Sequence, residues 1–205
     1  YCFYNQLTGY AFATDKAVAT DFSQGDSLFI HADTLQLYTF HVNTDSVYRE
    51  ARAYHKVRFY RTDIQGVCDS LVFSSKDSGL TLYQDPILWN GKQQLLGEEI
   101  MVYMNDSTID WAHIQNQALS VEQLDSLNYN QVSGKDMKAY FEGGEMKQVD
   151  VDGSVRLVYF PMEKDSTLLG MNCSETSKLS MFLENRKLKK MAMSPKSNGT
   201  LYPMT

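Results

Sequence analysis

Acidic or amide side chains recur along the chain at a nearly constant spacing, and carboxylates in such a pattern could catalyse a reaction or bind a metal ion. They are Asp33, Asp69, Glu99, Asp136 and Asn172, at intervals of 36, 30, 37 and 36 residues. If the repeats stack in register, neighbouring carboxylates could act as the acid and base of a glycosidase or polysaccharide lyase, or bind calcium. The alternative is that each residue caps a turn at the start of a strand, and the amide at position 172 favours this alternative.

Other chemical signatures are sparse. The sequence contains no GxSxG elbow, Walker loop, HExxH helix or GxGxxG loop. No two histidines stand two or four residues apart, so we predict no metal site and no cofactor. We expect a protein that is not an enzyme. The histidines are His31, His41, His55 and His113.

Composition limits the class of protein. A chain of 205 residues with 43% apolar residues can bury its own core, and we expect a single domain over residues 1–205. The net charge of −6 argues against a nucleic-acid partner, because such binding requires phosphate-neutralising charge. Cys2, Cys68 and Cys173 are scattered and odd in number, which fits no disulfide framework. No secretory signal layout opens the sequence, so we expect a fragment of a longer exported protein.

The segments that carry these side chains are predicted to be β-strands. In residues 132–160, apolar residues stand near every second position, which is the period of a half-buried strand. Gly143-Gly144 and Asp152-Gly153 supply the positive φ angles of short hairpin turns. This stretch therefore predicts a three-stranded β meander.

The same unit recurs along the chain. Gly97, Gly134 and Gly170 each open a block of the pattern glycine, any residue, acid or amide, apolar residue. Periods of this length indicate stacked supersecondary units, here all-β with scarce helix. Residues 28–37 predict two strands or one strand bent at Asp33, and residues 120–127 are expected to be extended or turn rather than a short helix. The last strands carry Met181, Leu183 and residues 188–193, and the chain from Pro195 on is predicted to lack regular structure.

Several phrases of the sequence carry a family resemblance. They are SQGDSLFIHADTLQLY, VRFYRTDIQGVCDSLVF, DPILWNGKQQLLGEEI, NQVSGKDMKAYF and the final GTLYP. In these phrases the chain resembles the OstA-like proteins of Bacteroidetes-type bacteria, which are relatives of LptA and of the LptD amino-terminal domain in lipopolysaccharide transport. The similarity extends from about Ala17 to Pro203.

The resemblance implies a fold and a function. The fold would be a repetitive β-jellyroll shaped like a taco shell, in the periplasm, whose interior shields lipid acyl chains. The partners would be lipopolysaccharide or a related lipid, and other jellyroll domains that dock end to end. Unpaired edges at both ends of a β stack accept another chain by strand addition, which is compatible with that arrangement.

Two sets of residues are candidate lipid contacts. Lys187, Lys189 and Lys190 form a basic cluster that could meet anionic headgroups or simply be a solvated edge strand. The apolar lining of the groove is predicted from alternating positions, and methionines there suit a flexible surface. These positions could instead fill a closed core, and an inert β-solenoid or a β-helix enzyme stays open as an alternative. The groove candidates are Leu71, Phe73, Ile100, Val102, Met104, Met137, Ala139 and Phe141.

Overall fold

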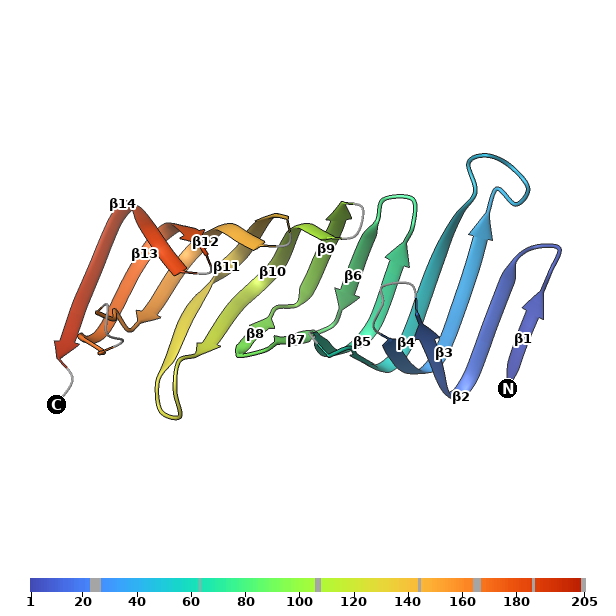
Figure 1. Ribbon diagram of the computed structural model, residues 1–205, viewed down its shortest axis with the longest axis horizontal. Helices are drawn as coiled ribbons and strands as arrows, with labels where there is room; N and C mark the ends of the chain where they lie inside the picture. Colours follow the sequence, from blue (N-terminus) through green and yellow to red (C-terminus); the bar gives the residue numbers. More distant parts are fainter. Residues whose placement is uncertain are drawn as a thin grey trace.

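The protein is built from antiparallel strands. The computed structural model describes residues 1–22, 27–62, 64–105, 108–143, 145–163, 167–185 and 187–203. This part of the chain holds fourteen strands and no helix, which confirms the all-β prediction. The molecule is elongated, with its termini at opposite ends (Figure 1). The strands are β1 (Cys2–Asn5), β2 (Tyr10–Asp21), β3 (Leu28–Phe40), β4 (Tyr48–Tyr60), β5 (Gln65–Ser74), β6 (Gly79–Tyr83), β7 (Ile87–Asn90), β8 (Gln93–Leu96), β9 (Glu99–Asn105), β10 (Thr108–Gln123), β11 (Tyr129–Glu142), β12 (Glu145–Tyr159), β13 (Gly170–Glu184) and β14 (Lys187–Pro203).

The strands follow one another as a meander in a single sheet. Strands β6 and β7 together match the length of one long strand, and so do β8 and β9. These four short strands form two couples: β6 pairs with β9, and β7 pairs with β8. Because β5 and β10 flank both couples, the pairing closes into a ring of six strands, β5-β6-β9-β10-β8-β7.

Alternate strands bend in their middle. Two consecutive residues with positive φ interrupt the extended backbone at Asp15-Lys16, His55-Lys56, Gln84-Asp85, Asn116-Gln117 and Gly153-Ser154. The ladder register shifts at the same places, for instance between Tyr54 and Val57. An insertion of this kind bends a strand and keeps the pairing on either side. The bends lie beside one another along the sheet, so they form one continuous ridge, which we call the ridge.

The ridge divides the sheet into two walls. We call wall A the half that carries β1, β6 and β9, and wall B the half that carries β7 and β8. Leu82 and Ile100 of wall A and Val57 of wall B have no solvent exposure. Among the described residues no helix or second sheet is present to cover them. The two walls must therefore pack against each other, and their inner faces form a single apolar core.

Two glycines lie where a strand passes the ridge. A Cβ atom at Gly134 would lie 2.5 Å from Val151 Cγ1 and 3.0 Å from the Asp152 carbonyl oxygen. A Cβ atom at Gly97 would collide with Cγ2 of Ile114. Glycine is required at both positions because the bent neighbouring strand approaches the backbone closely.

The ridge explains the repeat in the sequence. Asp33, Asp69, Glu99 and Asp136 all lie where β3, β5, β9 and β11 meet the ridge, so one period corresponds to two strands. The prediction that each caps the start of a strand is wrong for the three aspartates, which lie within long strands. Asn172 does not belong to the series, because it lies in wall B opposite Tyr159 and β13 passes the ridge between Thr176 and Lys178.

Two local predictions change in the structure. Asp152-Gly153 is not a hairpin turn, because β12 continues through it and Gly153 (φ 82°) takes part in the bend. The meander over residues 132–160 is therefore two long strands rather than three. Gly143 forms the other turn, and Gly144 lies outside the described residues. Residues 28–37 belong to one strand bent near Asp33, as one of the two alternatives stated.

The C-terminal prediction also changes. Strand β14 runs to Pro203, so the chain beyond Pro195 has regular structure. Met181 and Leu183 lie in β13, which is paired on both sides, and the terminal edge strand is β14. Residues 120–123 are extended within β10, as expected.

Candidate functional site: the apolar interior

Apolar side chains cross the inner face of wall A in continuous rows. In the ridge row, each residue is the Cα partner of the next from β2 to β14, and the middle row lies two residues further from the ridge. A shorter mouth row lies beyond them and contains Met104, Ile109, Phe141, Met146, Leu183 and Leu188. The ridge row contains Ala13, Leu35, Ala53, Leu71, Leu82, Ile100, Ile114, Met137, Val151, Leu179 and Met193. The middle row contains Ala11, Leu37, Ala51, Phe73, Leu80, Val102, Ala112, Ala139, Val149, Met181 and Met191.

The predicted groove residues all belong to these rows, but they differ in burial. Leu71, Ile100 and Met137 belong to the ridge row and are at most 3% exposed. Val102 and Ala139, in the middle row, are 8% and 4% exposed. Phe73, Met104 and Phe141 are only half-buried. The interior is thus a closed core beside the ridge, and its side chains become more exposed toward the mouth row, where the last three candidates keep accessible surface.

Wall B supplies the facing side of the interior. Leu88, Val132 and Leu157 are buried there against wall A. Leu95, the Cα partner of Leu88, and Tyr159, two residues further from the ridge than Leu157, are half-buried and also pack against the core. Burial, and secondarily the charge of Glu122, raises the pKa of the Tyr159 phenol, so it stays neutral at physiological pH. The mouth of wall B therefore adds apolar and neutral surface.

The lining of wall B becomes polar at the C-terminal end. Ser174 is buried opposite Leu157, and its hydroxyl donates a hydrogen bond of 2.6 Å to the Asn172 side-chain oxygen. Gly199 follows on β14. On wall A the same end carries half-buried Met181, Met191 and Met193. A flexible, polarizable methionine surface therefore faces a wall with small polar side chains.

The ridge carboxylates lie close to basic side chains on the outer surface. Asp33 lies 3.8 Å from Lys56 Nζ, and Asp69 lies 3.5 Å from His55 Nδ1. Asp136 lies 3.6 Å from His113 Nε2. Successive ridge carboxylates are separated by an intervening strand. Among the described residues no group of three or more histidine, cysteine or acidic side chains could hold a metal ion.

His113 and Cys68 have perturbed protonation. Burial and Lys138 lower the pKa of His113 more than Asp136 raises it, so the imidazole is neutral at physiological pH. Its Nδ1 lies 3.2 Å from Gln115 Nε2. Burial, followed by the charge of Asp69, raises the pKa of the Cys68 thiol to about 12. That thiol therefore stays protonated at physiological pH and is a poor nucleophile.

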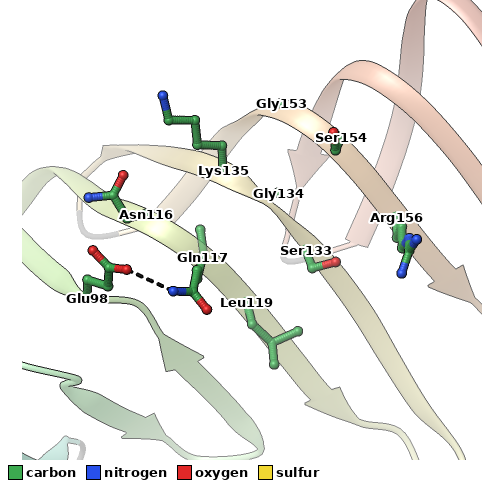
Figure 2. A pocket seen from close by; sticks show the side chains of 11 residues that line it. Glu98, Asn116, Gln117, Leu119, Ser133, Gly134, Lys135, Gly153, Ser154 and Arg156 are labelled. Atoms are coloured by element: carbon green, nitrogen blue, oxygen red, sulfur yellow. Dashed lines mark hydrogen bonds between the residues drawn. The ribbon is translucent and has the colours of Figure 1, made fainter.

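A shallow depression of about 750 Å³ lies on the outer surface along the ridge. Figure 2 shows Glu98 bonded to Gln117 at one side and Arg156 at the other. Leu119 and Ser133 alternate with the buried Ala118 and Val132, which places this depression outside the core. It contains a single carboxylate, so it lacks the acid and base pair of a glycosidase.

The basic cluster lies at the edge of the molecule. Lys187 and Lys190 are exposed on β14, and the Lys190 ammonium lies 5.6 Å from the centre of the Phe182 ring. Lys189 is bonded to Glu184 at 2.6 Å. Lys187 and Lys189 flank Leu188, which belongs to the mouth row, and Lys190 lies two residues beyond it. The cluster therefore lies beside the mouth of the interior.

Sequence reasoning missed part of the interior. Met191 and Met193 were assigned to a strand but not to the lining, and the facing residues of wall B were not identified. The alternation around Val132 and Leu157 is as clear as that around Val102. Only the bend at the ridge brings these segments opposite wall A, and positive φ at His55 or Asn116 has no reliable sequence signal.

No family model matches the chain, and no curated protein matches it. Among the described residues no helix is both long and apolar enough to cross a membrane.

Proposed function

We propose that the chain is a non-enzymatic lipid-binding protein of the bacterial periplasm, in which acyl chains lie in the mouth of the interior. The observation that carries the proposal is the unbroken apolar lining of wall A from β2 to β14, with half-buried side chains along its outer rows. The folded antiparallel sheet and its apolar lining support the proposal, because the OstA-like resemblance implies a β-jellyroll with an apolar interior. Lipopolysaccharide or a related lipid is the proposed ligand.

The burial gradient determines where the lipid binds. From Ala53 to Leu179 the residues of the ridge row are at most 3% exposed and leave no room for a ligand, as expected of a closely packed protein interior. The mouth row offers Met104 and Phe141, together with Leu183, as apolar contacts. Lys187 and Lys190 stand next to this row and can meet the anionic headgroup while the acyl chains lie along the methionines.

Replacing Phe141 with aspartate is expected to weaken lipopolysaccharide binding at least tenfold, because an unpaired charge would face the acyl chains. Tyr140 is the matched control, since it is the neighbouring aromatic residue of wall A but lies on the outer face, where it is 40% exposed and is the Cα partner of Gln148. Tyr140→Asp should bind as the parent does. Binding is measured by displacement of a fluorescent lipid from purified protein, with circular dichroism to verify folding. A folded Phe141→Asp variant of parental affinity would contradict the proposal.

The second part of the proposal concerns partners. Strand β14 has no partner on its outer side among the described strands, and β1 covers only the wall A half of β2. Such edges can pair between copies and form a linear bridge. We therefore propose end-to-end docking with similar domains.

Proline in β14 is expected to weaken this assembly. Successive backbone N–H groups of a strand point to opposite sides, so one of Met191 and Ala192 donates outward. Proline at that position should leave the pairing with β13 intact and shift assembly to higher concentration, whereas proline at the other should destabilise the fold. Sedimentation velocity over a hundredfold range of concentration measures the effect. A parent protein that stays monomeric throughout this range would rule out the bridge.

A further inference from the structure

Six aromatic rings form a continuous surface on the outer face of wall A, near the N-terminus. We call Phe3, Tyr10, Phe12, Tyr38, Phe40 and Tyr48 the aromatic track. Ring centres are 5.8 Å apart for Phe3 and Phe12, 6.0 Å for Phe12 and Tyr10, and 5.0 Å for Tyr10 and Tyr38. They are 6.2 Å apart for Tyr38 and Phe40, and 4.7 Å for Phe40 and Tyr48. The track crosses β1 to β4.

The core does not require these rings. The inner face of the same strands is occupied by Ala11, Leu35 and Leu37, and the track residues alternate with them. Further along wall A, the same outer face carries Lys138 and Asp150. Polar side chains are thus compatible with this side of the sheet. A separate stacked pair, Tyr103 and Trp111 with ring centres 4.0 Å apart, lies further along it, and the run of six rings belongs to the N-terminal strands.

Polar groups surround the rings. The Arg52 guanidinium lies 4.9 Å from the centre of the Tyr38 ring and forms an ion pair with Glu50. The Tyr38 hydroxyl donates a hydrogen bond of 2.9 Å to Gln36 Oε1. The Lys76 ammonium lies 5.6 Å from the centre of the Tyr48 ring. The track therefore combines aromatic rings with hydrogen-bond donors and acceptors that lie over and beside them.

This combination selects one class of ligand. An acyl chain cannot form hydrogen bonds with the polar groups, and the net charge of −6 disfavours a nucleic acid. A β-linked pyranose presents a flat C–H face that stacks on an aromatic ring and equatorial hydroxyls that bond to groups beside it. Neighbouring rings are separated by about the length of one pyranose unit. We propose that the aromatic track binds an extended, neutral β-1,4-linked glycan, independently of the lipid proposed for the interior.

The test is isothermal titration calorimetry of the full chain with chitohexaose and cellohexaose, with maltohexaose as the curved, α-linked control. Saturable binding of at least one β-1,4-linked hexasaccharide is expected, with at least tenfold weaker binding of maltohexaose. Tyr38→Ala should weaken binding at least tenfold, while Tyr38→Phe keeps the ring and should stay within threefold of the parent. Tyr202→Ala removes an exposed tyrosine at the opposite end of the molecule and should have no effect.

Tyr48→Ala, at the end of the track, provides a second variant if Tyr38→Ala does not fold, and it should weaken binding at least threefold. The proposal is overturned if neither β-1,4-linked hexasaccharide binds, if maltohexaose binds equally well, or if the folded track variants bind as the parent does. Self-association that Tyr48→Ala abolishes, without any sugar binding, would assign the track to a second copy of the chain and would also overturn the glycan.

Discussion

Replacing Val102 with aspartate is expected to unfold the protein. Val102 is 8% exposed and lies in the middle row of wall A between Leu80 and Ala112. An unpaired carboxylate there costs several kcal/mol, which is a large part of the roughly 5–15 kcal/mol that stabilises a typical domain. Loss of lipid binding in this variant would therefore reflect loss of the fold, and the mouth position Phe141 is the proper place to test the ligand.

Val18→Asp is the matched control for Val102→Asp. Val18 is also a valine within a strand, but it is 61% exposed on wall B. A charge at an exposed position changes stability by at most about 0.5 kcal/mol. Urea denaturation followed by circular dichroism measures both variants. Parental stability of Val102→Asp would mean that the two walls do not close on each other at this position.

Replacing Gly134 with alanine is expected to destabilise the protein by about 2–3 kcal/mol. The new methyl group would lie 2.5 Å from Val151 Cγ1 and 3.0 Å from the Asp152 carbonyl oxygen, and the carbonyl belongs to backbone that cannot rotate away. Overpacking of this kind typically costs 1–3 kcal/mol. The measurement is the free energy of unfolding in urea.

Two further variants identify the cause. Gly79→Ala is the control away from the ridge, because its added methyl group would meet only the Tyr103 ring at 3.3 Å, and that side chain can move. We expect a change within 1 kcal/mol. Val151→Ala in the Gly134→Ala background should recover part of the loss, giving a favourable coupling in the double-mutant cycle. Additive losses would show that the collision with Val151 is not the source of the destabilisation.

Alternation of apolar side chains is enough to predict most of the strands and part of the inner face of wall A. The apolar residues at every second position around Val149 and Leu157 face the interior in the structure as well, because successive side chains of an extended chain point to opposite sides. Glycines such as Gly97 and Gly134 also marked the repeat correctly, since the close approach of a neighbouring strand leaves no room for a side chain. These features depend on local geometry, and local geometry is encoded by neighbouring residues.

The bends were not predictable in the same way. Asp152-Gly153 has the composition of a hairpin turn, yet β12 continues through it because β11 and β13 pair with both of its halves. Asn116-Gln117 has no turn signature, yet both residues adopt positive φ. Turn residues allow the backbone to adopt positive φ angles. The pairing of neighbouring strands then decides whether the chain forms a hairpin turn or a bend within one strand.

The spacing of apolar residues predicts an all-β chain and the inward-facing side chains of wall A. Whether such a side chain fills the core or stays half-buried depends on how the two walls close on each other. Leu71 and Phe73 have the same alternation, but Leu71 lies beside the ridge, where the facing wall excludes solvent, and Phe73 lies two residues further out. Burial decreases with the distance of a residue from the ridge. That distance is a tertiary property, because the ridge exists only where the bends of neighbouring strands align.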